Sequence, residues 1–325
     1  MLVHHLTSVD GEIVFDLDPD VAGAAVGRTY LREGVTAEHG AVLARAATYR
    51  AAIFEERVAG AAATIRPRLI DTEAETFDRL RDEVAPMAEA GRFALADERS
   101  SVARGIVAAM AAWFRGLEGR RIVVHGFDDL GAEVARLVVE RGGHLAGVST
   151  ASGAIASGSG LDIDAVEATR ADHGELFVTQ LGLELHRTDE ALDLAVDAAV
   201  LGGAVGTIDR ETAERISAAV VVPSSDAPYA EAGLDVLRRR GIVALPDTVT
   251  TAGPTLEALA PRGLTDAEIA ARADRLIGER IEGARSSKVD PYRYATTLAD
   301  TFLTTWVPAD HLPDGPAVLP TPSMP

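Results

Sequence analysis

The chain has 325 residues, of which 47% are hydrophobic, and it contains no cysteine. This length and composition predict a cytoplasmic protein of two domains with real hydrophobic cores, and they exclude disulfides and thiolate metal sites. The formal net charge of -19 argues against nucleic acid and anionic membranes as partners. Lys288 is the only lysine, and this acidic, lysine-poor usage fits either a halophilic, high-salt cytoplasm or GC-rich coding.

Hydrophobic periodicity predicts a mixture of strands and helices in residues 1–118. Strands are expected at 12–17, 26–30, 58–65 and 91–95, and helices at 41–53, 71–90 and 100–117. Thr36 is the predicted N-cap of the first helix, with His39 where a capping box usually has Glu. The charged, glycine-containing segment 118–120 marks the predicted boundary between two domains.

Residues 119–260 alternate strand and helix, as a doubly wound parallel sheet does. Strands are expected at 121–124, 144–149, 198–201, 220–222 and 242–245, and helices at 132–140, 161–173, 209–218 and 229–240. The glycine- and serine-rich stretch 151–160 is expected to be a loop. Two further helices are predicted within 261–307, and the proline-rich residues 308–325 are predicted to be a disordered tail.

The segment 120–131 places a buried strand before a glycine turn and an amphipathic helix, as in the first unit of a dinucleotide-binding domain. Gly126 and Gly131 hold the first and third glycine positions of that fingerprint, but Asp128 stands at the second. A carboxylate there repels a pyrophosphate by roughly 3 kcal/mol per like-charge pair at about 5 Å and an effective dielectric near 20. Asp128 or Asp129 is expected to cap the free N–H groups of the helix instead.

Several blocks, in the right order and spacing, resemble the Glu/Leu/Phe/Val dehydrogenase family over most of the chain. The blocks are AGAAVGRT at 22–29, ATYRAA at 47–52, GFDDLG at 126–131, GLDID at 160–164, GIVALPD at 241–247 and TAG at 251–253. The resemblance implies an α/β protein with a substrate and assembly domain over 1–118, a Rossmann domain over 119–260 and C-terminal helices over 261–307. It also implies oxidative deamination of an L-amino acid to a 2-oxo acid, with NAD(P) as cofactor.

The residues that perform the family's chemistry differ in this chain. The lysine that activates water corresponds to Ala62, and an alanine cannot move a proton or stabilise an alkoxide. The lysine that holds the substrate carboxylate corresponds to Arg50, which either grips a carboxylate or is an ordinary exposed helix residue. The catalytic aspartate corresponds to Glu98, beside Asp97, and this carboxylate either serves the site or belongs to a helix N-terminus.

The resemblance also implies which residues would touch the cofactor. These positions are Gly126, Phe127, Asp128, Leu130, Gly131 and Thr150. Thr150 replaces the acidic residue that binds the adenosine ribose, which on its own would suit NADP. Asp226 and Thr251 replace two family asparagines, and Arg28 replaces the second of two glycines near the substrate, where it narrows or charges the pocket.

Three functions are compatible with these differences. The chain is a non-catalytic paralogue (a pseudoenzyme) with a regulatory or assembly role, an NAD(P)-dependent oxidoreductase that uses Arg50 and Glu98 in a remodelled site, or a small-ligand sensor. The expected ligand is an amino acid or a 2-oxo acid. The expected assembly is a homo-oligomer or a hetero-oligomer with a paralogue. No metal site is expected, because the eight histidines are scattered along the chain.

Overall fold

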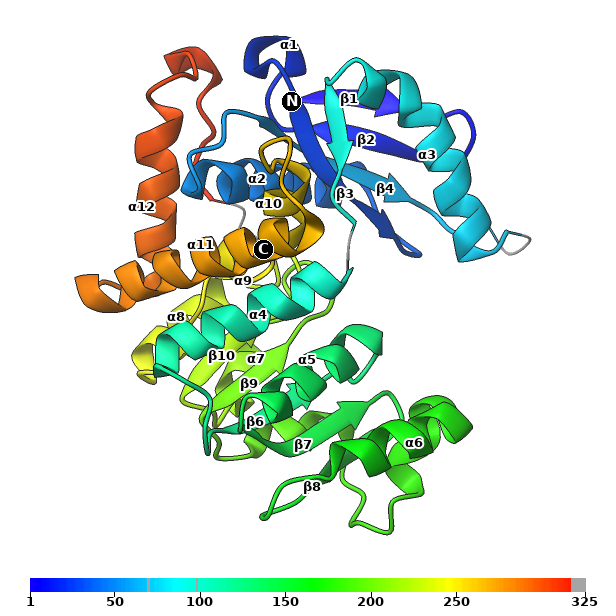
Figure 1. Ribbon diagram of the computed structural model, residues 1–325, viewed down its shortest axis with the longest axis vertical. Helices are drawn as coiled ribbons and strands as arrows, with labels where there is room; N and C mark the ends of the chain where they lie inside the picture. Colours follow the sequence, from blue (N-terminus) through cyan, green and yellow to red (C-terminus); the bar gives the residue numbers. More distant parts are fainter. Residues whose placement is uncertain (69–70, 98, 317–325) are drawn as a thin grey trace, which may run out of the picture. The chain divides into compact units, whose positions relative to one another are not determined.

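The computed structural model in Figure 1 describes residues 1–68, 71–97 and 99–316. These residues divide into two units. The first comprises the described parts of 1–98, 254–269 and 295–317, and the second comprises 99–253 and 270–294. The domain boundary proposed after residue 118 falls in the connection between helix α4 (Arg99–Phe114) and strand β6 (Arg121–His125), within the second unit. The α/β fold class predicted from the sequence is confirmed.

The first unit is built on a five-stranded sheet in the order β1-β2-β4-β3-β5 (Figure 1). Its strands are β1 (Leu2–His5), β2 (Gly11–Phe15), β3 (Ala25–Leu31), β4 (Ala59–Ile65) and β5 (Phe93–Leu95). Strand β2 is antiparallel to both β1 and β4, whereas β3 is parallel to both β4 and β5. All seven residues of β4 are buried, and small side chains let this strand lie in the middle of the unit.

Helix α2 (Ala37–Ile53) packs closely against β4 because Gly60 has no side chain. A Cβ at Gly60 would lie 2.1 Å from the amide nitrogen of Thr48, and the Gly60 amide donates a hydrogen bond of 3.0 Å to the Thr48 hydroxyl. The predicted N-cap Thr36 is confirmed, and with His39 it forms a capping box: Thr36 accepts from the His39 amide, and the His39 side chain accepts from the Thr36 amide. These contacts fix where the later residues of α2 lie over the sheet.

The first unit also contains α3 (Glu73–Glu89), which is as long as α2, and several helices that are short or shared with the second unit. The latter are α1 (Pro19–Ala22), α10 (Gly253–Ala258), the 3₁₀ turn η3 (Ala309–His311) and parts of α11 (Asp266–Ser287) and α12 (Pro291–Leu303). The turn η3 lies within the predicted tail 308–325, and Arg45 donates to the carbonyl oxygen of Gly315 at 3.1 Å. Residues 317–325 of that tail lie outside the described residues.

The second unit carries a six-stranded sheet in the order β11-β10-β9-β6-β7-β8. The strands after β6 are β7 (His144–Thr150), β8 (Gly153–Ala156), β9 (Ala198–Leu201), β10 (Val220–Pro223) and β11 (Val243–Ala244). All neighbouring pairs are parallel except β7 and β8. The strand order reverses between β6 and β9, and open sheets of this kind bind ligands at the carboxyl ends of the strands at such a reversal.

Strand β8 corrects the loop predicted for 151–160. It forms a tight antiparallel hairpin with β7, in which Thr150 lies opposite Gly153, and Gly153 has a φ of +137°. Alanine, serine and glycine have weak strand propensity, so only the pairing with the edge of β7 makes this stretch a strand. The exposed strand β1 was missed for a related reason, because its four residues pair with β2 without burying a face.

The helices of the second unit follow the predicted order. They are α4, α5 (Asp129–Glu140), α6 (Ile163–His173), η1 (Gly174–Thr179), η2 (Thr188–Asp193), α7 (Arg210–Arg215), α8 (Glu231–Arg239), α9 (Asp247–Thr250) and parts of α11 and α12. The two 3₁₀ helices η1 and η2 and the short helix α9 were not predicted. Among the helices of the described ranges, none is long and apolar enough to cross a bilayer.

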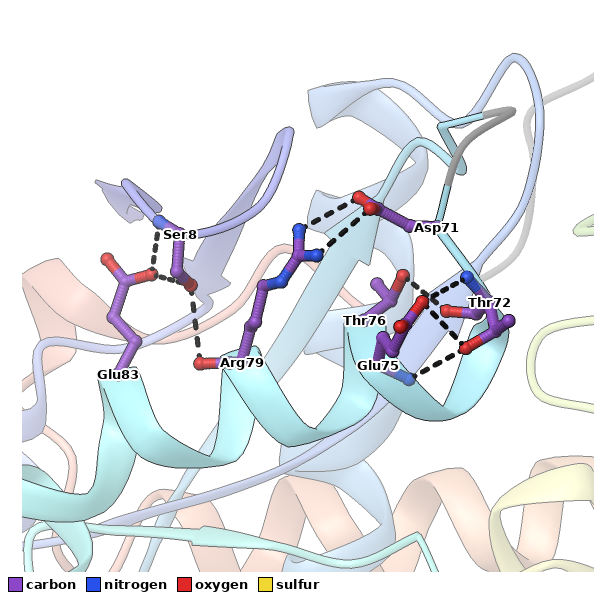
Figure 2. A network of polar contacts seen from close by, with 7 residues as sticks. All are labelled: Ser8, Asp71, Thr72, Glu75, Thr76, Arg79 and Glu83. Atoms are coloured by element: carbon purple, nitrogen blue, oxygen red, sulfur yellow. Dashed lines mark hydrogen bonds and ion pairs between the residues drawn. The ribbon is translucent and has the colours of Figure 1, made fainter.

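Helix α3 is attached to the turn between β1 and β2 by the carboxylate of Glu83 (Figure 2). Glu83 accepts hydrogen bonds from the amide and hydroxyl of Ser8, at 2.9 and 2.5 Å. It also accepts from the amide and hydroxyl of Thr7, at 2.7 and 2.9 Å. Burial opposes ionisation, but these four donors together lower the pKa of Glu83 from 4.5 to about 2. Ionised Glu83 therefore contributes stability above pH 4.5, and this contribution is lost as the pH falls toward 2.

We expect Glu83→Gln to lower the free energy of unfolding by about 1–2 kcal/mol at pH 7, since an amide cannot accept all four bonds. The difference between variant and wild type should shrink as the pH falls from 4.5 toward 2. Urea unfolding at several pH values measures both effects. Glu89→Gln at the end of the same helix is the control, and an equal loss in both variants would contradict the role of Glu83.

Candidate functional site

The turn between β6 and α5 keeps two of the three glycine functions of a dinucleotide-binding loop. Gly126 has a φ of +91°, which allows the tight turn that follows β6. A Cβ at Gly131 would lie 2.6 Å from the carbonyl oxygen of Gly126, so only glycine lets α5 pack this closely on the strand. The local backbone therefore matches the predicted strand, turn and helix.

The middle position of the turn has become a helix cap. Asp128 is the N-cap of α5, and its carboxylate accepts a hydrogen bond of 2.9 Å from the Gly131 amide. The prediction that an aspartate caps this helix is confirmed for Asp128. Asp129 has another partner, because Arg170 of α6 donates to its carboxylate at 2.5 Å. Two carboxylates thus lie at the helix N-terminus, where the free N–H groups favour negative charge.

Two residues that the sequence reasoning missed, Ser149 and Phe177, tie this turn to its surroundings. The carbonyl oxygen of Ser149 accepts from the amides of Gly126 and Phe127, at 3.2 and 2.7 Å. The Phe127 ring is 2% exposed and lies 5.4 Å from the ring of Phe177 in η1. In the sequence, the aromatic residue Phe127 beside Gly126 is the sign that another element covers this turn.

Thr150, at the carboxyl end of β7, is turned into the protein. Its hydroxyl donates to the carbonyl oxygen of Glu175 at 2.9 Å and accepts from the Ser152 amide at 3.1 Å. Its own carbonyl oxygen accepts from the Thr188 hydroxyl at 2.9 Å. With an exposure of 4%, Thr150 holds η1 and the β7–β8 hairpin together.

His125, the last residue of β6, lies beside a hollow at the carboxyl edge of the sheet. The hollow has a volume of about 670 Å³ and is lined by His125, residues 151–153 and residues 185–189. The Nδ1 atom of His125 lies 2.8 Å from the Ser149 hydroxyl. Burial lowers the pKa of His125, while the Asp189 carboxylate acts in the opposite direction. His125 was not singled out from the sequence, although it directly precedes the glycine turn.

The fold brings together Asp226 and Thr251, which stand at the positions of the two family asparagines. Asp226 and Thr251 are both buried, and the Thr251 hydroxyl donates to the Asp226 carboxylate at 2.7 Å. Nearby, the buried carboxylate of Asp247 accepts from the Ala227 amide at 2.9 Å. The pair of side-chain amides implied by the family resemblance is thus replaced by a carboxylate and a hydroxyl that bond each other.

In the first unit, the residues that the sequence predicts to lie near a substrate are on β3, β4 and α2. Ala62 is fully buried in β4, directly opposite Val14 of β2 and Arg28 of β3. Arg50, in the last turn of α2, is 1% exposed, so the alternative of an ordinary exposed helix residue is wrong. A buried arginine requires anionic or polar surroundings, because leaving its charge unsolvated is costly.

The predicted carboxylates of the first unit are only partly placed. Glu98 lies outside the described residues. Asp97 accepts from the amide and the hydroxyl of Thr29, both at 2.7 Å, and so it holds the chain after β5 against β3. Gly27 of the former glycine pair is needed for strand packing, since a Cβ there would lie 2.4 Å from the Ala61 carbonyl oxygen. In the described ranges, no group of three or more His, Asp or Glu side chains could hold a metal ion.

Comparison with known proteins shows which family the chain resembles in sequence and fold. Residues 97–256 match the family model of glutamate/leucine/phenylalanine/valine dehydrogenase. The chain is 29% identical over 188 residues to NADP-specific glutamate dehydrogenase A1 of Halobacterium salinarum, and 32% identical over 157 residues to the NAD-specific glutamate dehydrogenase of Staphylococcus aureus. These matches cover 55% and 47% of this chain. They cover 45% and 37% of the relatives, so less than half of each relative's length is matched.

Solved structures give the same result for the fold. The chain is similar to a hetero-hexameric glutamate dehydrogenase of Thermus thermophilus in its leucine-bound form, with a TM-score of 0.74, 21% identity and coverage of 92% of this chain and 86% of that one. It is also similar to L-tryptophan dehydrogenase of Nostoc punctiforme, with a TM-score of 0.61, 19% identity and coverage of 94% of both chains. The chain belongs to the glutamate/leucine/phenylalanine/valine dehydrogenase family.

Proposed function

We propose that this chain is a non-catalytic member of the amino-acid dehydrogenase family with a regulatory or assembly role. The observation that carries the proposal is the hydrogen bond from the Gly131 amide to the Asp128 carboxylate. Amides in the first turn of a helix hold the phosphates of a dinucleotide in folds of this kind. In this chain a side chain of the protein itself takes that amide.

The charges around the turn do not fit a dinucleotide pyrophosphate. Asp128 would repel a phosphate about 5 Å away by roughly 3 kcal/mol at an effective dielectric near 20, which corresponds to about two decades of affinity. Arg170 partly neutralises Asp129, but no such ion pair involves Asp128 among the described residues. The buried hydroxyl of Thr150, already engaged with Glu175 and Ser152, is not available to an adenosine ribose.

Ala62, in the sheet of the first unit, supports the same proposal. Ala62 stands at the position of the proton-transferring lysine and is surrounded by the neighbouring strands β2 and β3. General acid–base help typically accelerates a reaction by about 10²–10⁴-fold. With Lys288 as the only lysine in the sequence and an alanine at position 62, the family mechanism has no ammonium group in this sheet.

A role in assembly fits the relatives. One similar structure is a hetero-hexameric glutamate dehydrogenase in a leucine-bound form. By analogy, we propose that this chain forms a homo-oligomer or joins a catalytic paralogue, and that an amino acid or a 2-oxo acid is its ligand. Fold-level analogy alone supports this part of the proposal.

The cofactor part can be tested by titrating the purified chain with NADH and NADPH, using nucleotide fluorescence and thermal shift. We expect no binding to the wild type with a Kd below about 100 μM, and at least tenfold tighter binding to Asp128→Gly, since the carboxylate is removed. Asp162→Gly, which removes the N-cap of α6 instead, is the control and should bind no better than the wild type. Tight binding of either nucleotide to the wild type would overturn the proposal.

The catalytic part is tested with a panel of L-amino acids and both NAD⁺ and NADP⁺. We expect the wild-type rate to lie at least about 10³-fold below that of an active glutamate dehydrogenase assayed in parallel, because the general base is missing. Absorbance at the reduced-nicotinamide band follows the reaction. Robust turnover of any amino acid by the wild type would show instead that a remodelled site is active.

A further inference from the structure

Arg28 and Ala62 are direct neighbours in the sheet of the first unit. Strands β3 and β4 are parallel and in register from Ala25 opposite Ala59 to Leu31 opposite Ile65, and in this register Arg28 lies opposite Ala62. Neighbouring strands are about 4.8 Å apart, and residues in register point to the same side of a sheet. The long side chain of Arg28 and the methyl group of Ala62 therefore share one face.

Helix α2 covers that face. Gly60, two residues before Ala62, is bonded to the Thr48 hydroxyl of α2, and Val26, two residues before Arg28, packs in one cluster with Ala51 of α2. Arg50 lies between Thr48 and Ala51 in the helix and is 1% exposed. The backbone of Arg50 therefore passes close to the row formed by Val26 and Gly60, one row away from Arg28 and Ala62.

We propose that Arg28 supplies the second cation of a carboxylate-binding site in the first unit, with Arg50 as the first. The inference rests on the proposed function and adds the residue that binds the carboxylate of the proposed ligand. The family resemblance places a glycine at position 28 and a lysine at position 62, whereas this chain has an arginine and an alanine. Compared with the family pattern, the long cationic side chain is therefore on β3 instead of β4. The summed volume of the two neighbouring side chains is similar in both cases.

The change from ammonium to guanidinium decides what such a site can do. A guanidinium binds a carboxylate bidentately and stays protonated at every pH that a folded protein tolerates. It therefore holds an anion but does not pass a proton to or from the ligand. The site binds the carboxylate of an L-amino acid or a 2-oxo acid and leaves the ligand unchanged.

The binding test uses isothermal titration of the full chain with L-leucine, L-glutamate and 2-oxoglutarate. We expect at least one of the three to bind, and Arg28→Gln to raise its Kd at least tenfold, with a smaller increase in Arg28→Lys. Arg32→Gln, an exposed arginine one residue beyond the same strand, is the matched control and should leave the Kd within about twofold. Unchanged binding in Arg28→Gln, or no binding of all three probes at 10 mM (roughly the weak limit of site-specific binding), would overturn the inference.

A thermal-unfolding cycle tests the placement of Arg28 without any ligand. Ala62→Lys should lower the Tm of the wild type by at least roughly 5 °C, because it buries an ammonium group and puts it beside a guanidinium. In an Arg28→Gly background the same substitution should cost at most half as much. Equal costs in both backgrounds would refute the neighbour relation. If the wild type turns over an amino acid and Arg28→Gln loses binding, only the proposed function is refuted. If the wild type is inactive and Arg28→Gln binds as tightly as the wild type, only this inference is refuted.

Discussion

The N-terminus of α5 has a limited number of free amides, and a capping side chain and a phosphate compete for them. In a dinucleotide-binding loop the middle glycine leaves these amides to the cofactor, so the helix is completed only when the cofactor binds. In this chain the Asp128 carboxylate takes the Gly131 amide and completes the helix permanently. An N-cap of this kind stabilises a protein by about 0.5–2 kcal/mol. The fold therefore gains stability from the contact that removes the phosphate site.

The same exchange recurs at other positions that the family resemblance assigns to ligands. The Thr150 hydroxyl bonds the carbonyl oxygen of Glu175, and the Thr251 hydroxyl bonds the Asp226 carboxylate. Both threonines are buried, and each contact joins residues 25 positions apart in the sequence. A polar group in an active site usually keeps some hydrogen-bonding capacity for the ligand, whereas these groups use it inside the protein. The positions have become part of the protein's own packing.

Local patterns in the sequence were enough for the elements that depend on local rules. The cap at Thr36, the turn at Gly126 and the cap at Asp128 each follow from the residue types and their spacing, and all three are present. The parts that failed depend on pairing or burial over long distances. Strand β8 exists only against the edge of β7, and the burial of Arg50 depends on tertiary packing that no local sequence pattern indicates. The register that sets Arg28 beside Ala62 is likewise invisible without the pairing of two strands 34 positions apart.

The Gly131 amide decides whether the turn can hold a phosphate, and NMR can observe this amide directly. We would follow the Gly131 N–H signal of the labelled wild type and of Asp128→Gly while NADH is added to 1 mM. We expect the wild-type signal to keep its position and its slow hydrogen exchange, because the Gly131 N–H donates to Asp128. In Asp128→Gly we expect the signal to shift as NADH binds. A wild-type Gly131 signal that shifts on addition of NADH, with a midpoint below about 100 μM, would contradict this role of Asp128.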